Sequence, residues 1–271
     1  MVDETAHLEA FEWQVGVWDR ISDVYSRAID QRFTAVVEAL IGQARLGEGE
    51  RVLDLGTGTG AVAERAAREL GEFGSVLGVD ISPEMLALAR KRIAVRSLSN
   101  VTFREGRAEA VPADTDSFDV VLSSLTLMYV IDRSAAAREI ARVLRPGGRL
   151  IAAVWGSPDE CDIVRFQQTA GRFAGPPPVA GVGPGALADP SPLLHQLAEA
   201  GVSAHVESEV LAFDFPDFHS AWTALAGVTT AHLPLEQQQA AQRAVRDEMY
   251  PDGDAPRRFE NLTKFIVGQS T

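Results

Sequence analysis

The sequence predicts an α/β protein in which a parallel sheet carries helices on both faces. Short apolar runs alternate with stretches of helical periodicity from Glu50 to Trp155, which is the pattern of βα units. The first apolar run ends in three glycines at alternate positions, as expected for a strand, a tight turn and the start of a helix. With 271 residues, of which 46% are hydrophobic, the chain can bury the core of one such domain.

Two helical stretches precede the first strand, one through Val17, Ile21 and Val24 and the next through Val36 and Leu40. Beyond them, the apolar runs predict strands at 51–55, 75–80, 101–104, 118–123 and 149–155. Helices are predicted at 61–70, after Ser82-Pro83-Glu84, and at about 133–144. Arg145-Pro146-Gly147-Gly148 ends the last of these helices and turns the chain into the strand at 149–155.

The second half of the chain differs from the first in composition and in the order of its predicted elements. Residues 171–192 are rich in Gly, Pro and Ala, which indicates a loop. A helix at 191–200, a strand at 202–213, two helical stretches within 217–248 and a last strand at 259–267 follow. One buried face of the strand at 202–213 is predicted to consist of Val202, Ala204, Val206, Ser208 and Val210. The helices within 217–248 have no place in a minimal doubly wound sheet, so we expect a helical lid over the carboxyl ends of the strands.

The composition favours a small-molecule ligand. The formal net charge is −13, whereas binding to nucleic acid needs clustered Lys and Arg. Cys161 is the only cysteine, which excludes an internal disulfide and a thiolate metal cluster, and we assign no metal ligands. Residues 1–8 are acidic and polar, and no apolar run is long enough to cross a bilayer. We therefore expect a cytoplasmic protein with no membrane or nucleic-acid partner.

The turn from Gly56 to Gly60 predicts a site for a ligand that contains adenosine, since glycine permits positive φ and lets a ligand lie against the backbone. Asp80 ends the second predicted strand, where a carboxylate can accept hydrogen bonds from both ribose hydroxyls. This feature suits NAD and S-adenosylmethionine equally. Asp54, just before the turn, favours a ligand with a cationic amino or sulfonium group over a pyrophosphate. The turn itself carries no Lys or Arg.

Several motifs follow one another in a fixed order between residues 13 and 155. They are Trp18-Asp19-Arg20-Ile21-Ser22-Asp23-Val24-Tyr25, Val52 to Gly60, Gly78-Val79-Asp80-Ile81-Ser82, Met85-Leu86-Ala87-Leu88-Ala89, Ser117-Phe118-Asp119-Val120-Val121 and Leu144-Arg145-Pro146-Gly147-Gly148-Arg149-Leu150. In this ordered set the chain resembles the class I S-adenosylmethionine-dependent methyltransferases. The branch it resembles includes ubiquinone and menaquinone biosynthesis enzymes and small-molecule enzymes of secondary metabolism. The resemblance implies a Rossmann-like sheet of seven strands, mostly parallel, whose last strand is antiparallel.

The resemblance also implies roles at S-adenosylmethionine for residues that match the family's motifs. The loop against the methionine part of the cofactor would be formed by Gly56, Gly58 and Gly60, and Asp54 would help to organise it. Asp80 would hold the ribose, and Ile81 and Met85 would pack on the adenine. Further implied contacts are Tyr25, which would close over the cofactor, and Ser123, at the end of the fourth strand.

At the adenine edge the chain departs from the family's pattern. Relatives usually have Gly-Asp-Ala after the third strand, whereas this chain has Gly106-Arg107-Ala108-Glu109. A guanidinium has only donors, so Arg107 cannot accept a hydrogen bond from the adenine amino group. Two alternatives remain: Glu109 accepts instead, or Arg107 turns to solvent. Ala108 keeps the family's backbone contact in either case.

The cofactor implied by the resemblance supplies an activated methyl group, so in-line transfer to oxygen, nitrogen or carbon chiefly needs alignment and exclusion of water. A phenol or enol acceptor would still gain from a general base, for which His232 is the first candidate and Tyr129 the second. Trp13, Trp18 and Trp222 are expected to be packing residues. Cys161 is expected to act as a small apolar residue.

The chain is expected to form one domain with three regions, as a monomer or a homodimer. Residues 1–45 would cover the cofactor site, residues 46–155 would form the cofactor-binding core, and residues 156–271 would supply the substrate-side loop, the lid and the last two strands. The apolar and aromatic content of the third region predicts a small hydrophobic or aromatic acceptor.

Three other functions were weighed against methyl transfer. An NAD(P)-dependent oxidoreductase shares the glycine turn and Asp80, but the chain has no Tyr-x-x-x-Lys pair in the expected region. A nucleic-acid methyltransferase is disfavoured by the negative charge and by the absence of an Asn-Pro-Pro-Tyr-like motif. A cofactor-binding relative that catalyses cyclisation, or that only binds, would have the same pocket.

Overall fold

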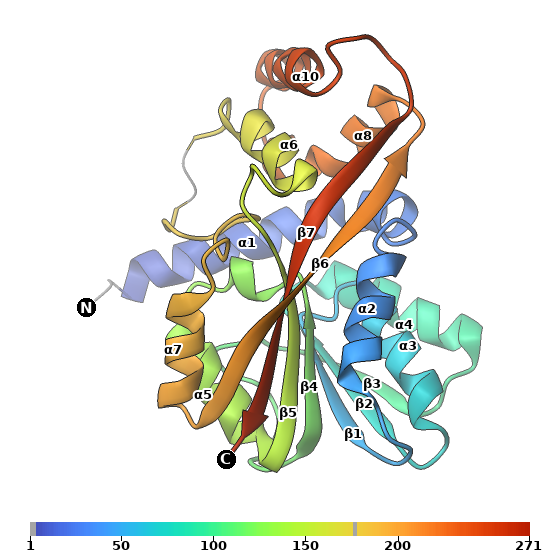
Figure 1. The fold of residues 1–271 in the computed structure, drawn as a ribbon, viewed down its shortest axis with the longest axis vertical. Coiled ribbons are helices and arrows are strands. Elements are labelled where there is room, and N and C mark those ends of the chain that lie inside the picture. Colours follow the sequence, from blue (N-terminus) through green and yellow to red (C-terminus); the bar gives the residue numbers. More distant parts are fainter. Residues whose placement is uncertain (1–3, 176–177) are drawn as a thin grey trace.

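The computed structural model describes residues 4–175 and 178–271, and it contains one seven-stranded sheet with the strand order β3-β2-β1-β4-β5-β7-β6. The strands are β1 Arg51–Leu55, β2 Ser75–Asp80, β3 Val101–Glu105, β4 Phe118–Ser124, β5 Leu144–Trp155, β6 Val202–Phe215 and β7 Arg257–Ser270. Strands β1 to β5 pair in parallel, whereas β7 lies antiparallel between β5 and β6. The predicted fold class is therefore confirmed, including the antiparallel last strand (Figure 1).

Helices cover both faces of the sheet. Helices α2, α3 and α4 lie on one side of it in Figure 1, and α5 and α7 lie on the other. The elements other than strands are α1 Glu4–Val24, the π-helix η1 Tyr25–Ile29, α2 Thr34–Ala44, α3 Ala61–Leu70, α4 Pro83–Arg96, the 3₁₀ helix η2 Leu127–Tyr129, α5 Arg133–Val143, α6 Asp162–Gly171, α7 Ser191–Glu199, α8 Phe218–Leu225, α9 Gly227–Thr230 and α10 Leu235–Met249.

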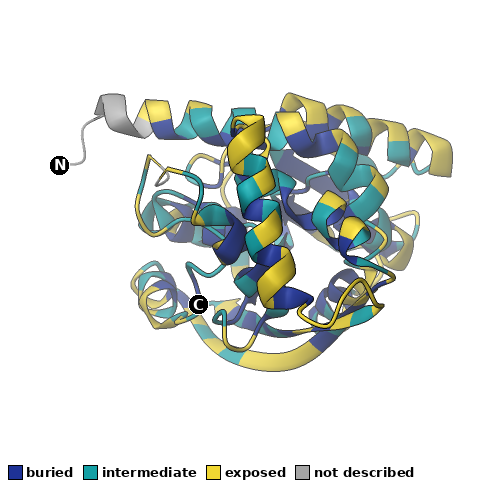
Figure 2. Cartoon of the chain, turned by 90° about the horizontal axis from the view of Figure 1, so that it is seen from above, coloured by how far each residue is buried: buried dark blue, intermediate teal, exposed yellow. Residues whose placement is uncertain are grey.

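Local sequence signals explain where the helices next to the site begin. Helix α4 starts at Ser82, whose hydroxyl accepts a hydrogen bond from Met85 N at 3.1 Å, and Pro83 occupies its first position. Helix α5 starts at Asp132, whose carboxylate accepts from Ala135 N at 2.9 Å. Figure 2 shows that buried residues gather between the layers while the helices expose their outer faces. In the described part of the chain, no helix combines the length and the apolar character needed to span a membrane.

Strand β5 begins earlier than predicted. It already pairs with β4 at Leu144, and the register shifts between Phe118 and Val120. Residues Arg145 to Gly148 therefore bulge out of the strand instead of forming a separate turn before it. The reason lies in Gly147, whose φ of +77° lets the backbone leave the ladder and return to it.

The predicted buried face of β6 is correct only for its first half. Val202 is buried and Val206 half-buried, but Val210 is 58% exposed. Beyond Val210 the opposite face of the strand is the buried one, with Phe213 and Phe215 in the core. The change occurs because the β6–β7 hairpin extends past the other strands, where α6 and α8 cover its other face (Figure 1).

Helices α6 and α8 to α10, with the far end of the β6–β7 hairpin, form a layer beyond the carboxyl ends of the strands, which we call the cap (Figure 1). Its interior is aromatic and includes Phe166, Phe218, Trp222, Tyr250 and Phe259. The sequence predicted the helices within 217–248 as a lid but missed α6. The predicted loop at 171–192 has turns without further helix before α7 in its described part, and residues 176 and 177 lie outside the described residues.

A fully buried asparagine on β7 fastens the cap to the sheet. The Oδ1 atom of Asn261 accepts hydrogen bonds from Ile163 N at 2.9 Å and from Cys161 Sγ at 3.2 Å. Its Nδ2 atom donates to the carbonyl oxygens of Leu211 and Phe259. One side chain thus joins α6, β6 and β7, in a place where water cannot replace a missing partner.

We predict that Asn261→Leu lowers the free energy of unfolding by about 2–4 kcal/mol, because it leaves buried donors and acceptors without partners. Urea unfolding followed by circular dichroism measures the change. Glu260→Leu is the matched control, since the Glu260 side chain is exposed on the same strand, and it should change stability by less than about 0.5 kcal/mol. Equal effects of the two substitutions would contradict this account.

Candidate active site at the carboxyl ends of the strands

The glycine turn between β1 and α3 requires glycine for geometric reasons. Gly56, Gly58 and Gly60 have φ values of +76°, +52° and +81°, which side chains rarely adopt. A Cβ atom at Gly56 would lie 2.2 Å from the Thr126 side chain, whereas a Cβ atom at Gly58 would meet nothing within 4 Å. The turn is therefore packed against the protein at its first glycine and has open space at its second.

Asp80, at the end of β2, shapes the turn. Its Oδ2 atom accepts a hydrogen bond from Gly58 N at 2.8 Å, and its Oδ1 atom accepts one from Ser82 N at 2.9 Å. Burial raises the pKa of the Asp80 carboxyl, and these N–H donors oppose that shift. Each carboxylate oxygen keeps a further lone pair, so Asp80 can hold the turn and still accept from a ligand.

A cavity lies in front of the turn, and its empty space, with the open solvent at its mouth included, is about 760 Å³. Nine residues that the sequence singled out line it: Tyr25, Gly56, Gly58, Asp80, Ile81, Met85, Ala108, Glu109 and Tyr129. They come from η1, from the ends of β1 and β2, from the first turn of α4, and from the segments that follow β3 and β4. Parallel strands end at the same edge of the sheet, which explains why residues far apart in sequence meet here.

Four predicted cofactor residues lie outside the lining of this cavity. Asp54 is buried beneath the turn, Gly60 packs against Ala89 of α4, and Ser123 is fully buried where its hydroxyl donates to Leu55 O at 3.0 Å. Arg107 is exposed, and its guanidinium lies 5.7 Å from the centre of the Phe11 ring. Ser124, the neighbour of Ser123, lines the cavity instead.

The sequence predicted that residues 1–45 cover the cofactor site, but it did not single out the residues of α1 that line the cavity. Phe11, Gln14 and Trp18 line the cavity from this helix, and their spacing of three and four residues places them on one face. That spacing was visible in the sequence, but it equally fits a helix that packs on a core. Trp18 was expected only to pack, and it does contact Tyr129 edge-to-face with ring centres 4.9 Å apart.

The segment after β4 is conformationally strained. Leu125 has a φ of +57°, which is rare for a non-glycine residue, and its N–H donates to Ala153 O at 2.8 Å. The next residue, Thr126, donates its hydroxyl to Gly56 O at 3.3 Å. The strained turn therefore brings Ser124, Leu125 and Thr126 to the cavity wall opposite Asp80.

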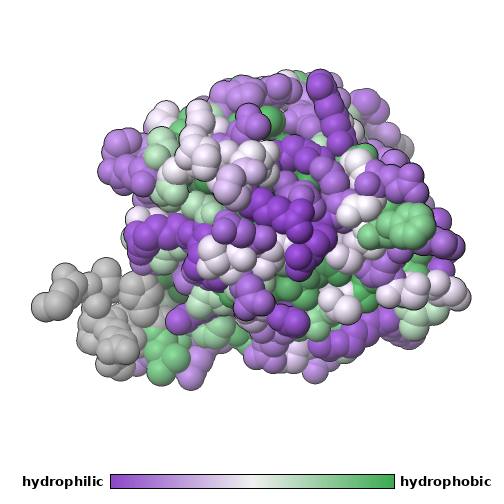
Figure 3. Space-filling view, turned by 90° about the horizontal axis from the view of Figure 1, so that it is seen from below, coloured by the Kyte–Doolittle hydropathy of each residue, from purple (hydrophilic) through white to green (hydrophobic). Residues whose placement is uncertain are grey.

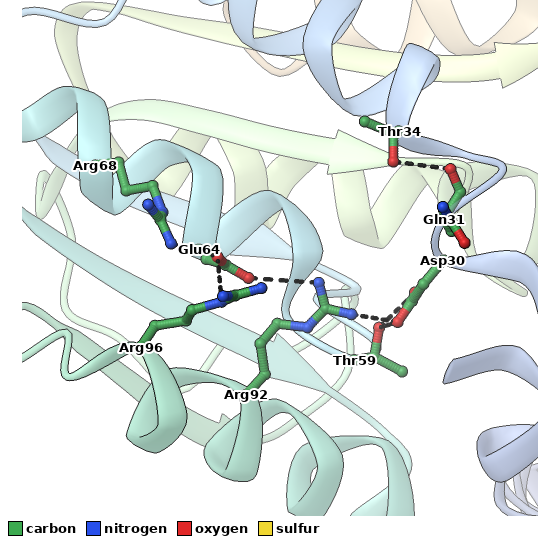
Figure 4. A network of polar contacts seen from close by, with 8 residues as sticks. All are labelled: Asp30, Gln31, Thr34, Thr59, Glu64, Arg68, Arg92 and Arg96. Carbon is green, nitrogen blue, oxygen red and sulfur yellow. Dashed lines mark hydrogen bonds and ion pairs between the residues drawn. The ribbon is translucent and has the colours of Figure 1, made fainter. Parts of the chain in front are cut away.

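A polar network ties the glycine turn to the N-terminal region (Figure 4). The Thr59 hydroxyl lies 2.7 and 2.8 Å from the two carboxylate oxygens of Asp30, which follows η1, and Asp30 also pairs with Arg92 of α4. Glu64 of α3 pairs with Arg92 at 3.5 Å and with Arg96 at 3.1 Å. The network fixes the turn relative to η1, the element that carries Tyr25.

Asp54 carries a strongly perturbed carboxyl. Its Oδ2 atom accepts from the Thr57 hydroxyl at 2.6 Å, and its Oδ1 atom has no hydrogen-bond partner. Burial raises the pKa of Asp54 to about 7, the Thr57 hydrogen bond opposes the shift, and the nearby charge of Asp80 adds to it. Near neutral pH this buried position therefore holds a carboxyl that a cationic ligand would ionise.

A second cavity, of about 750 Å³, adjoins the first. Gln14, Trp18 and Tyr129 line both cavities, and they form what we call the shared wall. The remaining lining residues are mostly apolar: Trp13, Val17, Gly171, Ala174, Gly175, Val182, Gly183, Pro184, Val228, Thr229 and His232. None of these side chains is a carboxylate, a Lys or an Arg.

Both predicted bases reach the second cavity. His232, in the segment between α9 and α10, meets Trp13 edge-to-face with ring centres 6.4 Å apart. Tyr129 lies in the shared wall, where burial raises the pKa of its phenol. Trp13, expected to pack, is therefore also a cavity residue.

The opposite end of the sheet, seen from below in Figure 3, is mostly hydrophilic, with hydrophobic side chains in small separate areas.

Residues 46–168 match the family model described as a methyltransferase domain. A ubiquinone/menaquinone biosynthesis C-methyltransferase, UbiE, of Serratia proteamaculans is 34% identical over 154 residues, which are 55% of this chain and 59% of that protein. The chain thus spans little more than half the length of this curated relative. The residues that match the family model include the glycine turn and Asp80 but exclude α1 and most of the cap.

Solved structures show the same fold. The YcgJ protein of Bacillus subtilis superposes with a TM-score of 0.64 at 21% identity, over 86% of this chain and 97% of that one. The [4+2]-cyclase SpnF superposes with a TM-score of 0.58 at 22% identity, over 87% of this chain and 80% of that one. These likenesses concern the fold alone. The family match, the ordered motifs and the sheet topology together make the chain similar to the class I S-adenosylmethionine-dependent methyltransferases of the UbiE-like type.

Proposed function

We propose that this protein transfers the methyl group of S-adenosylmethionine to a small, uncharged acceptor with a hydrophobic or aromatic body. The observation that carries the proposal is the pair of adjoining cavities, one at the glycine turn and one apolar, with Gln14, Trp18 and Tyr129 in both linings. Methyl transfer needs the donor and the nucleophile in line and close together, and two sites with a common wall provide this arrangement.

The first cavity has the groups that S-adenosylmethionine requires. Asp80 would accept hydrogen bonds from the ribose hydroxyls, and Ile81 and Met85 would pack on the adenine. The open space at Gly58 would receive the methionine part, near the negative field of Asp80 and Asp54. When bound, the cofactor supplies a sulfonium-activated methyl group, and the protein's residues then have to align the acceptor and exclude water.

The adenine edge would be held by residues that differ from the family's usual set. Glu109 lines the cavity, and its Oε1 atom accepts from Asp132 N at 3.3 Å, which leaves Oε2 for the adenine amino group. Arg107 instead lies over Phe11, and this contact would close the adenine end of the cavity. We infer that both alternatives weighed for this motif operate together, with Glu109 as acceptor and Arg107 turned outward.

The second cavity favours an uncharged acceptor, because a charged one would be buried without an ionic partner. A soft metalloid acceptor is a poor fit, since such acceptors prefer thiolates, the only cysteine is buried at Cys161, and burial raises the pKa of its thiol to about 12. Both cavities are lined by one chain, so the proposed reaction needs no second protomer.

Two other functions make different predictions. An NAD(P)-dependent oxidoreductase would need partners for a pyrophosphate, and neither Lys nor Arg is among the residues that line the first cavity. A cyclase would use the same two cavities without consuming the cofactor. Formation of S-adenosylhomocysteine with any acceptor from a panel of phenols, quinones, polyketides and amines therefore separates methyl transfer from cyclisation.

We predict that the protein binds S-adenosylmethionine and S-adenosylhomocysteine in isothermal titration calorimetry and does not bind NADH. Asp80→Asn should raise the Kd for S-adenosylhomocysteine by about tenfold or more, since it weakens hydrogen bonds to the ribose and to Gly58. Asp116→Asn, outside both cavities, is the control and should leave the Kd unchanged. Tight binding of NADH alone would falsify the proposed function.

We predict that the affinity for S-adenosylmethionine rises roughly tenfold from pH 5.5 to pH 7.5. The pKa of Asp54 is raised to about 7, so its carboxyl is protonated at pH 5.5 and mostly ionised at pH 7.5. The protonated form is the one that stabilises the folded protein, and this contribution is lost as pH rises through about 7. A cationic ligand favours the ionised carboxylate and therefore binds better at the higher pH. In calorimetric titrations, Asp54→Asn should flatten the pH dependence, and adenosine, which lacks the cation, should show little of it. A wild-type affinity that does not change with pH would contradict this linkage.

We predict that His232→Gln lowers kcat by about 100-fold for an acceptor that must lose a proton, while Tyr129→Phe lowers it much less. The reason is that the raised pKa keeps the Tyr129 phenol protonated at neutral pH, so this hydroxyl is a poor proton acceptor. Steady-state formation of S-adenosylhomocysteine measures both effects. His195→Gln, on the exposed side of α7, is the control for loss of an imidazole. A larger loss in Tyr129→Phe than in His232→Gln would reverse the assignment.

A further inference from the structure

Gln14 is a polar side chain at the junction of the two cavities. It lines both of them from α1, and it is only 7% exposed. Its Nε2 atom donates to the backbone carbonyl oxygen of Tyr129 at 2.6 Å. Because a carbonyl oxygen can only accept, this contact also fixes which end of the amide carries the nitrogen.

The rest of the Gln14 amide is free. Among the described residues, nothing donates a hydrogen bond to Oε1, and the second hydrogen of Nε2 has no acceptor. Trp18 and Tyr129, the other members of the shared wall, contribute mainly aromatic surface around it. Because Gln14 lines both cavities, this edge, with its unused acceptor and its unused donor, is open to a ligand or to water there.

From this geometry we propose that Gln14 binds the polar group of the acceptor that carries the nucleophile, and that this group has a hydrogen to donate, as a hydroxyl or an amine does. The inference rests on the proposed function and adds a specificity residue to it. A neutral hydroxyl matches the free edge, since it can donate to Oε1 and accept from Nε2. An ether or a ring without a polar group leaves Oε1 unpaired.

The contact would also orient the nucleophile. The hydrogen bond to Tyr129 holds the Gln14 amide in one direction, so a hydroxyl bound to its edge lies beside the first cavity. A hydroxyl that accepts from Nε2 keeps its other lone pair free for the methyl group. When its single hydrogen leaves Oε1 for a base, for which His232 is the candidate, the hydrogen bond from Nε2 still holds the oxygen in place.

The test uses protein saturated with S-adenosylhomocysteine and two probes, 1-naphthol and 1-methoxynaphthalene, whose binding is measured by calorimetry. Wild type should bind 1-naphthol about tenfold or more tightly than the ether, because only the naphthol has a hydrogen to donate. Gln14→Met, which keeps the length and apolar bulk of the side chain, should bind both probes about equally. Gln14→Asn, which draws the amide back by one methylene group, should also lose the preference.

Gln238→Met is the matched control. Gln238 makes the same kind of hydrogen bond, from Nε2 to the carbonyl oxygen of Leu233 at 2.8 Å, but it lines neither cavity, so its variant should keep the wild-type preference. A wild type that binds the ether as tightly as the naphthol, or that binds neither probe, overturns the inference. So does a Gln14→Met variant that still prefers the naphthol. Failure of wild type to bind S-adenosylhomocysteine tells instead against the proposed function.

Discussion

The site depends on one carboxylate, that of Asp80, which receives hydrogen bonds from two backbone N–H groups that belong to different segments. By accepting from Gly58 N and Ser82 N, it joins the glycine turn to the start of α4. Glycine adopts the positive φ values of the turn at little cost, and these hydrogen bonds hold the turn in that one conformation. The cavity at the carboxyl ends of the strands is a consequence of this junction.

Around the junction, the N-terminal region is attached at two points. Asp19 of α1 accepts a hydrogen bond from the Ser82 hydroxyl at 2.6 Å, and Asp30 after η1 holds the Thr59 hydroxyl. Between these contacts lies the π-helix η1 with Tyr25, and such turns occur frequently at functional sites. The N-terminal region that lines the first cavity is therefore fixed to the start of α4 and to the glycine turn.

The strands and the glycine turn could be predicted from sequence because their signals are local. Apolar runs and glycine spacing report burial and backbone conformation directly, and β1, β2 and α3 have the predicted bounds. Ser123 and Ser124 show what local signals do not predict. Which of these two adjacent serines lines the cavity depends on how β4 pairs with its neighbours. Gln14 and Trp18 were missed because nothing local distinguishes a helix face that lines a cavity from one that packs on a core.

Because one face of α1 lines both cavities, the two ligands are thermodynamically linked through it. A ligand in either cavity orders the same helix, so the second ligand meets a surface whose conformational entropy has already been lost. Such coupling is reciprocal: if bound cofactor raises the affinity for the acceptor by some factor, bound acceptor raises the affinity for the cofactor by the same factor. Residues 46–168, which define the family match, contain neither this helix nor most of the second cavity's lining, so the coupling depends on parts of the chain outside that match.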